Sequence, residues 1–354
     1  MPLPSIPDYS NSIKTPQLVH PAILGGGHPV VIGGVNVAKY AGGFCVVFPY
    51  ETPSKKYAVR CWHAEVSDAK KRTQLIADAL KSSSLPYFVG FEYFEDGIMT
   101  PTGKQPLVVM DWVNALPLKK YIAAHLHEPN TLNQLAENFK KMVSDLHEHH
   151  LSHGDLQHGN IMVNDDGSLT LVDYDSMYVP ALKGMKDEIK GLVGYQHEAR
   201  WKNELVSEKA DYFSELVIYI SIRVLATDNS YWEKLHIEDT ETLLFSGDDI
   251  QSKGSSPIFH ELRGIKDIKP LVDKLCEFMS RNSIEELEPL EDVIISRVDA
   301  ISSKWGKGNG YTPTPTKVEI DDPESIGGKW KTGNGYVKKS LDETAEAISS
   351  AWKK

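Results

Sequence analysis

A polar loop followed at once by a short apolar hairpin is the feature that most constrains this chain. The loop is the stretch "HGDLQHGN" at residues 153–160, and the runs "IMV" and "LTLV" come next, with Asp-Asp-Gly at 165–167 between them. Aspartate followed by glycine between two apolar runs is typical of a tight β-hairpin. Asp155 and Asn160 precede this hairpin and Asp173 follows it. Because a hairpin starts and ends at the same edge, we expect the three side chains to meet there.

These three residues match what phosphoryl transfer requires. The reaction needs a base beside the acceptor hydroxyl and ligands that hold a metal ion against the phosphates. Asp155 is the candidate base, and Asn160 and Asp173 are the candidate metal ligands. The interval from Asn160 to Asp173 suits two short strands and one turn.

The chain changes character near residues 111–115. Before this point β-like runs dominate, among them "PVVIGG", "GGFCVVFPY" and "KKYAVRCW". A helical run at 67–82, with Ser67 as its N-cap, separates them from further strands that begin at Pro86 and Gln105. Beyond the change the apolar residues have a helical period, apart from the hairpin. We therefore expect an α+β chain with a small β-rich N-lobe, a hinge and a larger helical C-lobe.

The predicted boundaries follow this pattern. Residues 1–28 are expected to be an irregular lead-in, residues 29–113 the N-lobe and residues 114–303 the C-lobe. Residues 304–354 are expected to be a flexible tail, because two copies of K-W-x-x-G-N-G-Y lie among Pro, Thr and Gly. The end of the tail, from Ser340, is predicted to form a short helix.

Composition narrows the classes of function. Lys and Arg total 38 against 49 Asp and Glu, so the formal charge is −11, which argues against nucleic acid as a partner. Three cysteines, Cys45, Cys61 and Cys276, have no zinc-binding spacing and suggest a reducing compartment. We see neither a signal peptide nor a membrane-spanning apolar run, so we expect a cytoplasmic protein with no membrane partner.

At these motifs the chain resembles the protein-kinase-like superfamily. "HGDLQHGN" is similar to the catalytic-loop pattern H-x-D-L-x-x-x-N, and "DYD" at 173–175 takes the place of D-F-G. The resemblance runs from about Val35 to Ile301. It implies a two-lobed protein-kinase-like fold, with ATP and Mg (or Mn) as cofactors. It also implies that Asp155 is the catalytic base.

The resemblance further implies a nucleotide site in the N-lobe. "YAGGFCVVF" resembles a degraded glycine-rich loop, "YAVRCW" the strand with a phosphate-contacting lysine, and "VVMDWV" the hinge that bonds adenine. The implied nucleotide-binding residues are Gly42, Gly43, Phe44, Val47, Arg60, Met110, Asp111 and Val113.

Several C-lobe residues have implied structural roles. Asp211 should tie down the catalytic loop, and His153 should be packed and hydrogen-bonded. Glu198 should form an ion pair, with Arg281 as a candidate partner. A further group could suggest a metal site but is expected to be a solvated cluster: His149, His150 and His158.

Three positions depart from the superfamily pattern. Gly154 replaces an arginine that receives an activating phosphate, which suggests activity independent of such phosphorylation. Asp175 replaces the glycine of D-F-G, where it could recruit a second cation or, as we expect, cap a turn. Arg60 replaces lysine, and the two are not interchangeable at a tight phosphate site. The helix that should supply an acidic partner for Arg60 offers only Asp78.

Three functions remain open on the sequence. The order of "GYQHEAR" and "ADYFSELVIY" favours a protein kinase, and the wider pattern resembles atypical bacterial Ser/Thr kinases. That group suggests a role in signalling or stress response, and as partners a protein substrate, a metal-dependent protein phosphatase and a von Willebrand A-type protein. Arg60 keeps open a nucleotide-binding pseudokinase scaffold. The catalytic loop alone is also similar to that of aminoglycoside and choline phosphotransferases.

Overall fold

The structure is a computed structural model that describes residues 3–65 and 68–294. The chain divides into two compact units, Met1–Ala300 and Ile301–Lys354, and all the described residues belong to the first. The predicted tail, with its repeats and final helix, lies outside the described residues, and so does the predicted N-cap Ser67.

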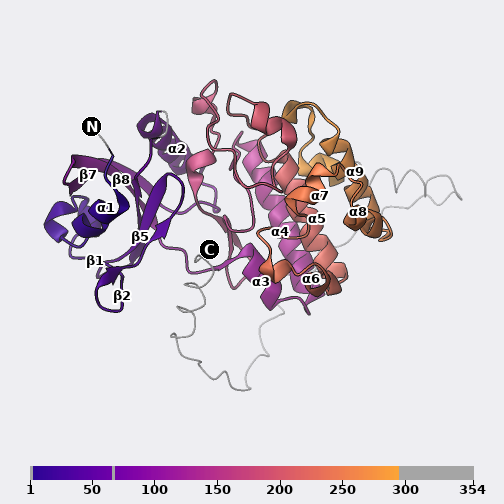
Figure 1. Cartoon of the computed structure of the whole chain (residues 1–354), viewed down its shortest axis with the longest axis horizontal. Helices are drawn as coiled ribbons and strands as arrows, with labels where there is room; N and C mark the ends of the chain where they lie inside the picture. The colour runs from indigo at the N-terminus through magenta and orange to yellow at the C-terminus, as the bar shows by residue number, and fades with distance from the viewer. Residues whose placement is uncertain (1–2, 66–67, 295–354) are drawn as a thin grey trace, which may run out of the picture. The chain divides into compact units, whose positions relative to one another are not determined.

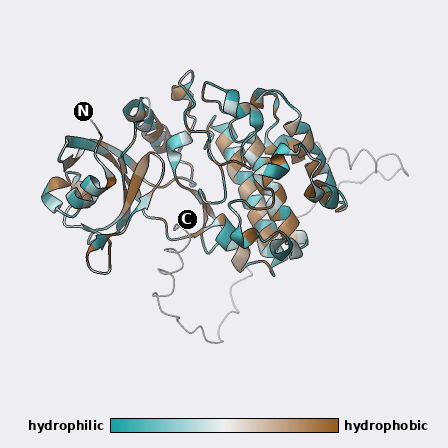
Figure 2. Cartoon of the chain, in the orientation of Figure 1, coloured by the Kyte–Doolittle hydropathy of each residue, from teal (hydrophilic) through white to brown (hydrophobic). Residues whose placement is uncertain are grey.

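A six-stranded antiparallel sheet forms the β-rich lobe, residues 3–111. The strand order is β1 (His28–Pro29), β5 (Cys45–Glu51), β6 (Lys56–Trp62), β8 (Gly103–Asp111) and β7 (Phe91–Thr100), and β4 (Tyr40–Ala41) also pairs with β5. A small hairpin, β2 (Val31–Ile32) with β3 (Asn36–Val37), lies between β1 and β4 in the sequence. The hydrophobic strand β5 (Figure 2) buries Val46, Phe48 and Tyr50 in one core.

The first 28 residues are more ordered than expected. They contain helix α1 (Ile6–Ser12), which starts with a capping box in which Ser5 and Asp8 bond each other's backbone N–H groups. Tyr9 is fully buried, and its hydroxyl donates to the carbonyl of Trp62 at 2.9 Å. The prediction of an irregular lead-in is therefore wrong for this helix, because its one buried face fastens it to the sheet.

Helix α2 (Ala69–Ser83) matches the predicted helical run, and Ile76 and Leu80 are buried as its periodicity indicated. The strand predicted from Pro86 begins later, at Phe91. Phe88 instead forms an isolated parallel bridge with Leu171 of the hairpin.

The helical lobe, residues 112–294, holds the remaining elements. Its helices are α3 (Leu118–Ala124), α4 (Pro129–Glu148), α5 (Tyr212–Thr227), α6 (Ser230–Lys234), α7 (Gly247–Gln251), α8 (Pro257–Leu262) and α9 (Lys269–Met279). Helices α4 and α5 run side by side (Figure 1), and α5 is buried along almost its whole length. A three-stranded sheet of β11 (Leu169–Leu171), β10 (Ile161–Val163) and β9 (Leu116–Pro117) carries the predicted hairpin.

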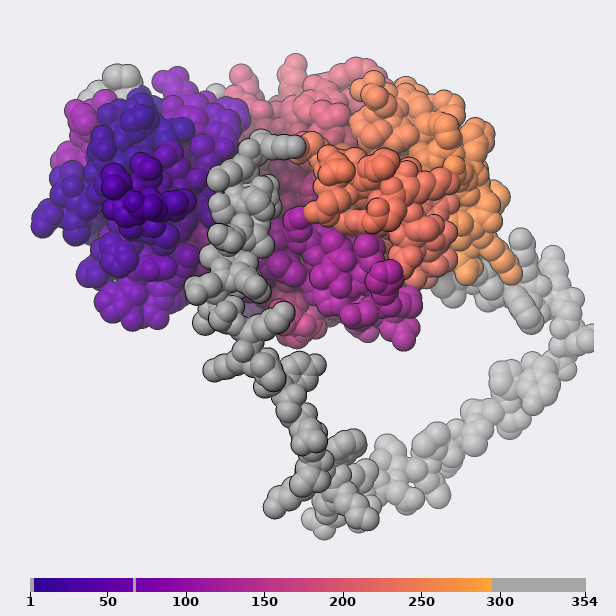
Figure 3. All heavy atoms as spheres, turned by 60° about the horizontal axis from the view of Figure 1, so that its bottom comes forward, coloured from indigo at the N-terminus to yellow at the C-terminus, as the bar shows by residue number. Residues whose placement is uncertain are grey.

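The architecture is thus mixed α+β, with an antiparallel sheet followed by helices, as the sequence predicts. Figure 3 shows the indigo and violet residues of the β-rich lobe gathered in one body and the pink to orange residues in another. Among the described residues, no helix is both long and apolar enough to cross a membrane.

Candidate active site

The hairpin brings the predicted catalytic residues to one edge. The side-chain amide of Asn160 donates to the backbone carbonyl of Asp155 at 2.8 Å and to its carboxylate at 3.0 Å. The carbonyl of Asn160 accepts from the N–H of Val172 at 3.0 Å, which places Asp173 next in line. Gly167 has a φ of +80° in the turn, where glycine has no steric cost.

The environment of Asp155 suits a proton acceptor. Burial raises the pKa of its carboxyl group; His153 opposes this, and the charge of Asp173 adds to it. A pKa above the ordinary value brings a carboxylate closer to the range that general bases use. The other carboxylate oxygen accepts from the N–H of Leu192 at 3.0 Å, so a segment beyond the hairpin also contacts the candidate base.

The catalytic loop is hydrogen-bonded to Asp211, the N-cap residue of α5. The Asp211 carboxylate accepts from the N–H groups of both His153 and Gly154, the latter at 2.9 Å. His153 is fully buried, and its ring bonds the carbonyl of Val172 at 2.9 Å. Both residues thus make the contacts expected of supports for the catalytic loop.

The backbone at Gly154 has no room for a side chain. Its φ is +76°, and a Cβ there would overlap the carbonyl oxygen of Ser176. No arginine side chain can therefore occupy this position in the present backbone. The carbonyl of Gly154 instead accepts a hydrogen bond from Arg200.

Arg60 lies at the inner end of the β-rich lobe. It is 3 % exposed on β6, and its Nη2 contacts the carboxylate of Asp175 and the Sγ of Cys45, the latter at 3.0 Å. Its Nη1 is buried, has no hydrogen-bond partner among the described residues, and lies 4.0 Å from the carboxylate of Asp173.

The acidic partner of Arg60, which the sequence leaves open, does not come from α2. Asp78, the acid that this helix offers, is exposed, and no ion pair joins it to Arg60 within the described residues. The prediction that Asp175 caps a turn is wrong, because its carboxylate pairs with Arg60. The spacing of motifs along the chain could not show that these two side chains meet.

The glycine turn lies open between β4 and β5. A Cβ on Gly43 would meet nothing within 4 Å, and Gly42 is held only through its backbone, to Cys45 and to the ring of His63. Phe44, next in the turn, packs against a small core that includes Met110. Val47 is directly opposite Arg60 in the sheet.

The expected hinge is partly engaged by the protein itself. The N–H of Asp111 donates to the carbonyl of Gly90 at 3.1 Å, and the N–H of Trp112 donates to the carbonyl of Lys56 at 3.2 Å. The backbone of Val113 makes no hydrogen bond to the part of the chain that the structure describes. Within the described residues, both backbone groups of Val113 are therefore available to a ligand.

The segment 186–203 contains a buried ion pair that sequence reasoning missed. Arg200 is 1 % exposed and bonds the carboxylate of Asp187 at 3.2 Å. Because Arg200 also bonds Gly154, it fastens this segment to the catalytic loop. Glu198 forms ion pairs as predicted, with Lys202 and Lys253. The candidate partner Arg281 is wrong, because it contacts Glu277 and Glu286 instead.

The histidines do not form one cluster. His149 and His150 are exposed, as expected, and lie at the end of α4. His158 is partly buried and its ring bonds the hydroxyl of Tyr195 at 2.8 Å, so it does not belong to a solvated cluster. Its burial lowers the pKa of the ring to about 4. Among the described residues, no group of three or more His, Cys, Asp or Glu side chains could hold a metal ion.

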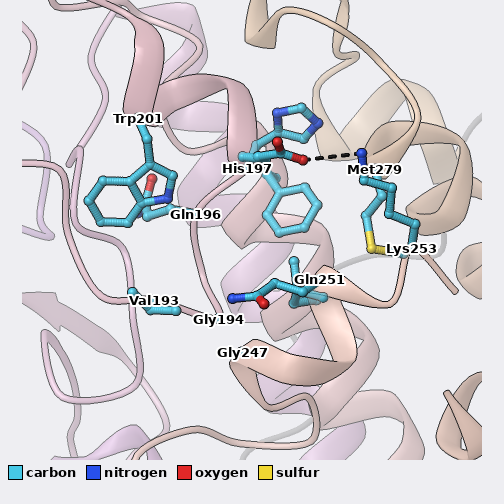
Figure 4. A pocket seen from close by; sticks show the side chains of 12 residues that line it. Val193, Gly194, Gln196, His197, Trp201, Gly247, Gln251, Lys253 and Met279 are labelled. Carbon is cyan, nitrogen blue, oxygen red and sulfur yellow. Dashed lines mark ion pairs between the residues drawn. The ribbon is translucent and has the colours of Figure 1, made fainter.

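A cavity of about 480 Å³ borders the segment 186–203. Figure 4 shows Trp201 and Gln196 on one side of it and Met279 and Lys253 on the other. Trp201 lines the cavity and is 46 % exposed. Gln196 is buried, its Oε1 accepts from Arg200 at 2.5 Å, and its Nε2 has no partner within the described residues.

Comparison with known families agrees with the geometry. Residues 97–212 match the family model described as the ABC1 atypical kinase-like domain, which lies within the protein-kinase-like superfamily. The matched span contains Asp155, Asn160, Asp173 and Asp211, but neither the glycine turn nor Arg60. This similarity suggests a kinase-like phosphotransferase and leaves the substrate undefined. No curated protein matches the chain.

Proposed function

We propose that this chain is an ATP- and Mg-dependent phosphotransferase that acts on Ser or Thr residues of a protein. The observation that carries the proposal is the arrangement at the hairpin edge. A partly buried carboxylate with a raised pKa, Asp155, is bonded to the amide of Asn160, and the exposed carboxylate of Asp173 lies close by. These are the groups that phosphoryl transfer requires.

The residues present fit a metal-bound nucleotide. The side chain of Asp173 is 58 % exposed. The side-chain nitrogen of Asn160 donates to the carboxylate of Asp155, so its amide oxygen is the atom that would bind the metal. Oxygen ligands of this kind suit Mg²⁺, which would bridge and neutralise the phosphates when bound. Arg60 offers an unpaired guanidinium N–H, and the bare backbone at Gly43 leaves room for close approach.

Within this site each protein group has a definite task. Asp155 accepts the proton of the acceptor hydroxyl. Asn160 and Asp173 hold the metal, and Arg60 contacts the phosphates. Met110 and the backbone of Asp111 and Val113 bind the base. These roles belong to the proposal and rest on the contacts described above.

A protein acceptor is favoured over a small molecule by the order of "GYQHEAR" and "ADYFSELVIY" in the sequence. The segment 186–203 also contacts the candidate base, because the N–H of Leu192 donates to Asp155. Val193, the next residue, lines the cavity together with the exposed Trp201, and we expect this cavity to bind residues that flank the acceptor hydroxyl. The proposed role is in bacterial signalling or stress response, and the proposed location is the cytoplasm. The proposed partners are a metal-dependent protein phosphatase and a von Willebrand A-type protein.

One observation favours a second function, a nucleotide-binding scaffold. Asn160 and Leu192 each donate to one carboxylate oxygen of Asp155, and each oxygen retains a lone pair for an acceptor hydroxyl. The position of a phosphate-contacting lysine, however, is held by Arg60, one end of which is bonded to Asp175 and Cys45. A pseudokinase would bind ATP beside this arginine without transferring a phosphoryl group.

The deciding experiment is incubation with γ-labelled ATP and Mg²⁺ or Mn²⁺, alone and with cell extract. We expect label in protein, loss of transfer with EDTA, and a fall of about 10³-fold in rate for Asp155→Asn with ATP binding retained. Asp173→Ala should lose metal-dependent ATP binding. Asp165→Asn, an exposed acid in the same hairpin, is the matched control and should transfer at the wild-type rate.

Each alternative gives a different result in this assay. Transfer at the wild-type rate by Asp155→Asn would remove the assigned base. ATP binding without any transfer would establish the scaffold. Label that enters only choline or an aminoglycoside would move the acceptor class to small molecules.

A further inference from the structure

The charge that neutralises Arg60 comes from the turn after the hairpin. Among the described residues, the carboxylates within 4.0 Å of its guanidinium belong to Asp173 and Asp175. Helix α2, where the resemblance would place an acidic partner, contributes none of them. A guanidinium that is 3 % exposed and always protonated needs such a partner, because an isolated buried charge is very costly.

The two terminal nitrogens of the Arg60 guanidinium differ in their hydrogen bonds. Nη2 is taken by Asp175 and by the thiol of Cys45. Nη1 is buried without a hydrogen bond to any described residue, 4.0 Å from an oxygen of Asp173. Buried donors without a partner are rare in native structures and call for an explanation. A phosphate oxygen is a preferred acceptor for a guanidinium N–H, and it is the group expected beside Asp173.

Tyr174 fixes the direction of both aspartates. It is 1 % exposed, its hydroxyl donates to the carbonyl of Leu171 at 2.6 Å, and it accepts from the N–H of Val89 at 3.0 Å. Asp173 and Asp175 flank this anchored ring, one 58 % and the other 22 % exposed at the side chain. One short turn thus presents an open carboxylate and an arginine-bound one.

We propose that Asp175 is a positioning residue that holds Nη2 of Arg60 so that Nη1 faces the triphosphate of the nucleotide. The inference rests on the proposed function and deepens it. In this chain Arg60 and Asp175 would then take the place of the lysine and the acidic residue of a helix that the resemblance implies. The "DYD" turn then serves both cofactors, with Asp173 for the metal and Asp175 for the phosphate-binding arginine, and α2 need not complete the site.

The kinetic test is Asp175→Asn, which preserves shape and removes the charge. We expect kcat to fall by roughly 10- to 100-fold, because a misdirected group costs about that much. The KM for ATP should rise, because a misdirected Arg60 loses its contact with the phosphates. The Mg²⁺ concentration for half-maximal rate should not change. Asp78→Asn, the exposed acid on α2, should behave as the wild type.

Two kinetic results would overturn the inference. An unchanged kcat in Asp175→Asn would leave Asp175 with a structural role only. A clear rise in the Mg²⁺ requirement would make it a metal ligand, the second-cation role that its charge first suggested.

A stability cycle tests the pair without any need for activity. Asp175→Asn should lower the Tm by about 5 °C or more, because it leaves Arg60 buried and unpaired. In an Arg60→Met background the same change should cost little or nothing. Equal losses in both backgrounds would show that the two side chains do not interact. If the wild type transfers no phosphoryl group, the proposed function fails while this cycle still decides whether the pair exists.

Discussion

Gly154 shows how one residue can decide what a catalytic loop is able to contain. Its carbonyl is bonded by the buried Arg200, and a Cβ on it would collide with the backbone of Ser176. The backbone therefore has no room for an arginine side chain at this position. A different arginine, Arg200 of segment 186–203, contacts the loop through the carbonyl of Gly154.

Replacing Gly154 by alanine should be strongly destabilising. We expect a loss of about 3 kcal/mol or more in the free energy of unfolding, since a positive φ and a backbone overlap both oppose the methyl group. Urea denaturation measures this loss. Gly184→Ala is the matched control, because its φ is +85° but a Cβ there meets nothing within 4 Å. It should lose only about 1 kcal/mol. Similar losses in both variants would show that the Ser176 contact relaxes.

Site residues could be predicted from the sequence where they lie at short, recognisable spacings along it. Asp155, Asn160 and Asp173 could be chosen because the loop and the Asp-Gly turn lie close together in the sequence. The pairs Arg60–Asp175 and Arg200–Asp187 could not, since each depends on a meeting of segments that local periodicity does not encode.

At the scale of elements, α4 and α5 are joined by a histidine with two acidic partners. His147 lies on α4 and contacts Glu215 of α5 and Glu291, each at 2.8 Å. Burial works against the charged ring, but the two carboxylates outweigh it and raise the pKa of His147 to about 10. The ordinary pKa of histidine, 6.5, is the value for the unfolded chain.

This contact should make stability depend on pH in a definite direction. A pKa that is higher in the folded protein stabilises fully below pH 6.5 and loses this effect as the pH rises toward 10. We expect His147→Gln to cost on the order of 3 kcal/mol at pH 6 and clearly less at pH 9.5. Denaturant unfolding at both pH values measures this. His150→Gln, at an exposed site, should change little. A cost that does not depend on pH would contradict a charged His147.

Elements were predictable in proportion to their own periodicity. Helix α2 and the hairpin have clear patterns and lie where expected. Helix α1 was missed because its sequence, "IPDYSNS", is short and polar, and its stability comes from packing Tyr9 into the sheet. The strand expected at Pro86 was shifted because Phe88 pairs with the hairpin.

At the scale of the whole molecule, several contacts between the two lobes are made by residues 174–186, which follow the hairpin. Asp175 contacts Arg60, the hydroxyl of Tyr174 accepts from Val89, and the carbonyl of Lys186 accepts from Arg72 of α2 at 2.9 Å. The order of lobes was predictable from the change of period near residue 111. These contacts were not, because each joins residues that are far apart in the sequence.

The tail supplies the last prediction, which belongs to the molecule as a whole. Trp305 with Tyr311 and Trp330 with Tyr336 stand in hydrophilic, glycine-rich sequence. Such a composition provides too little apolar surface to bury large aromatics within the segment itself. We therefore expect them to bind a pocket on a partner or on the two lobes of this chain, and two copies of the motif allow bivalent binding.

Removal of residues 304–354 should leave ATP turnover intact, because every catalytic and nucleotide-binding residue that we propose lies before residue 212. The truncated protein should lose a partner that the full chain retains on affinity capture. Trp305→Ala combined with Trp330→Ala should reproduce that loss, and each single change should reduce binding only in part if the copies act together. Retention of the partner by the double variant would mean that the repeats are not a docking device. Loss of turnover on truncation would instead make the tail a part of the catalytic unit.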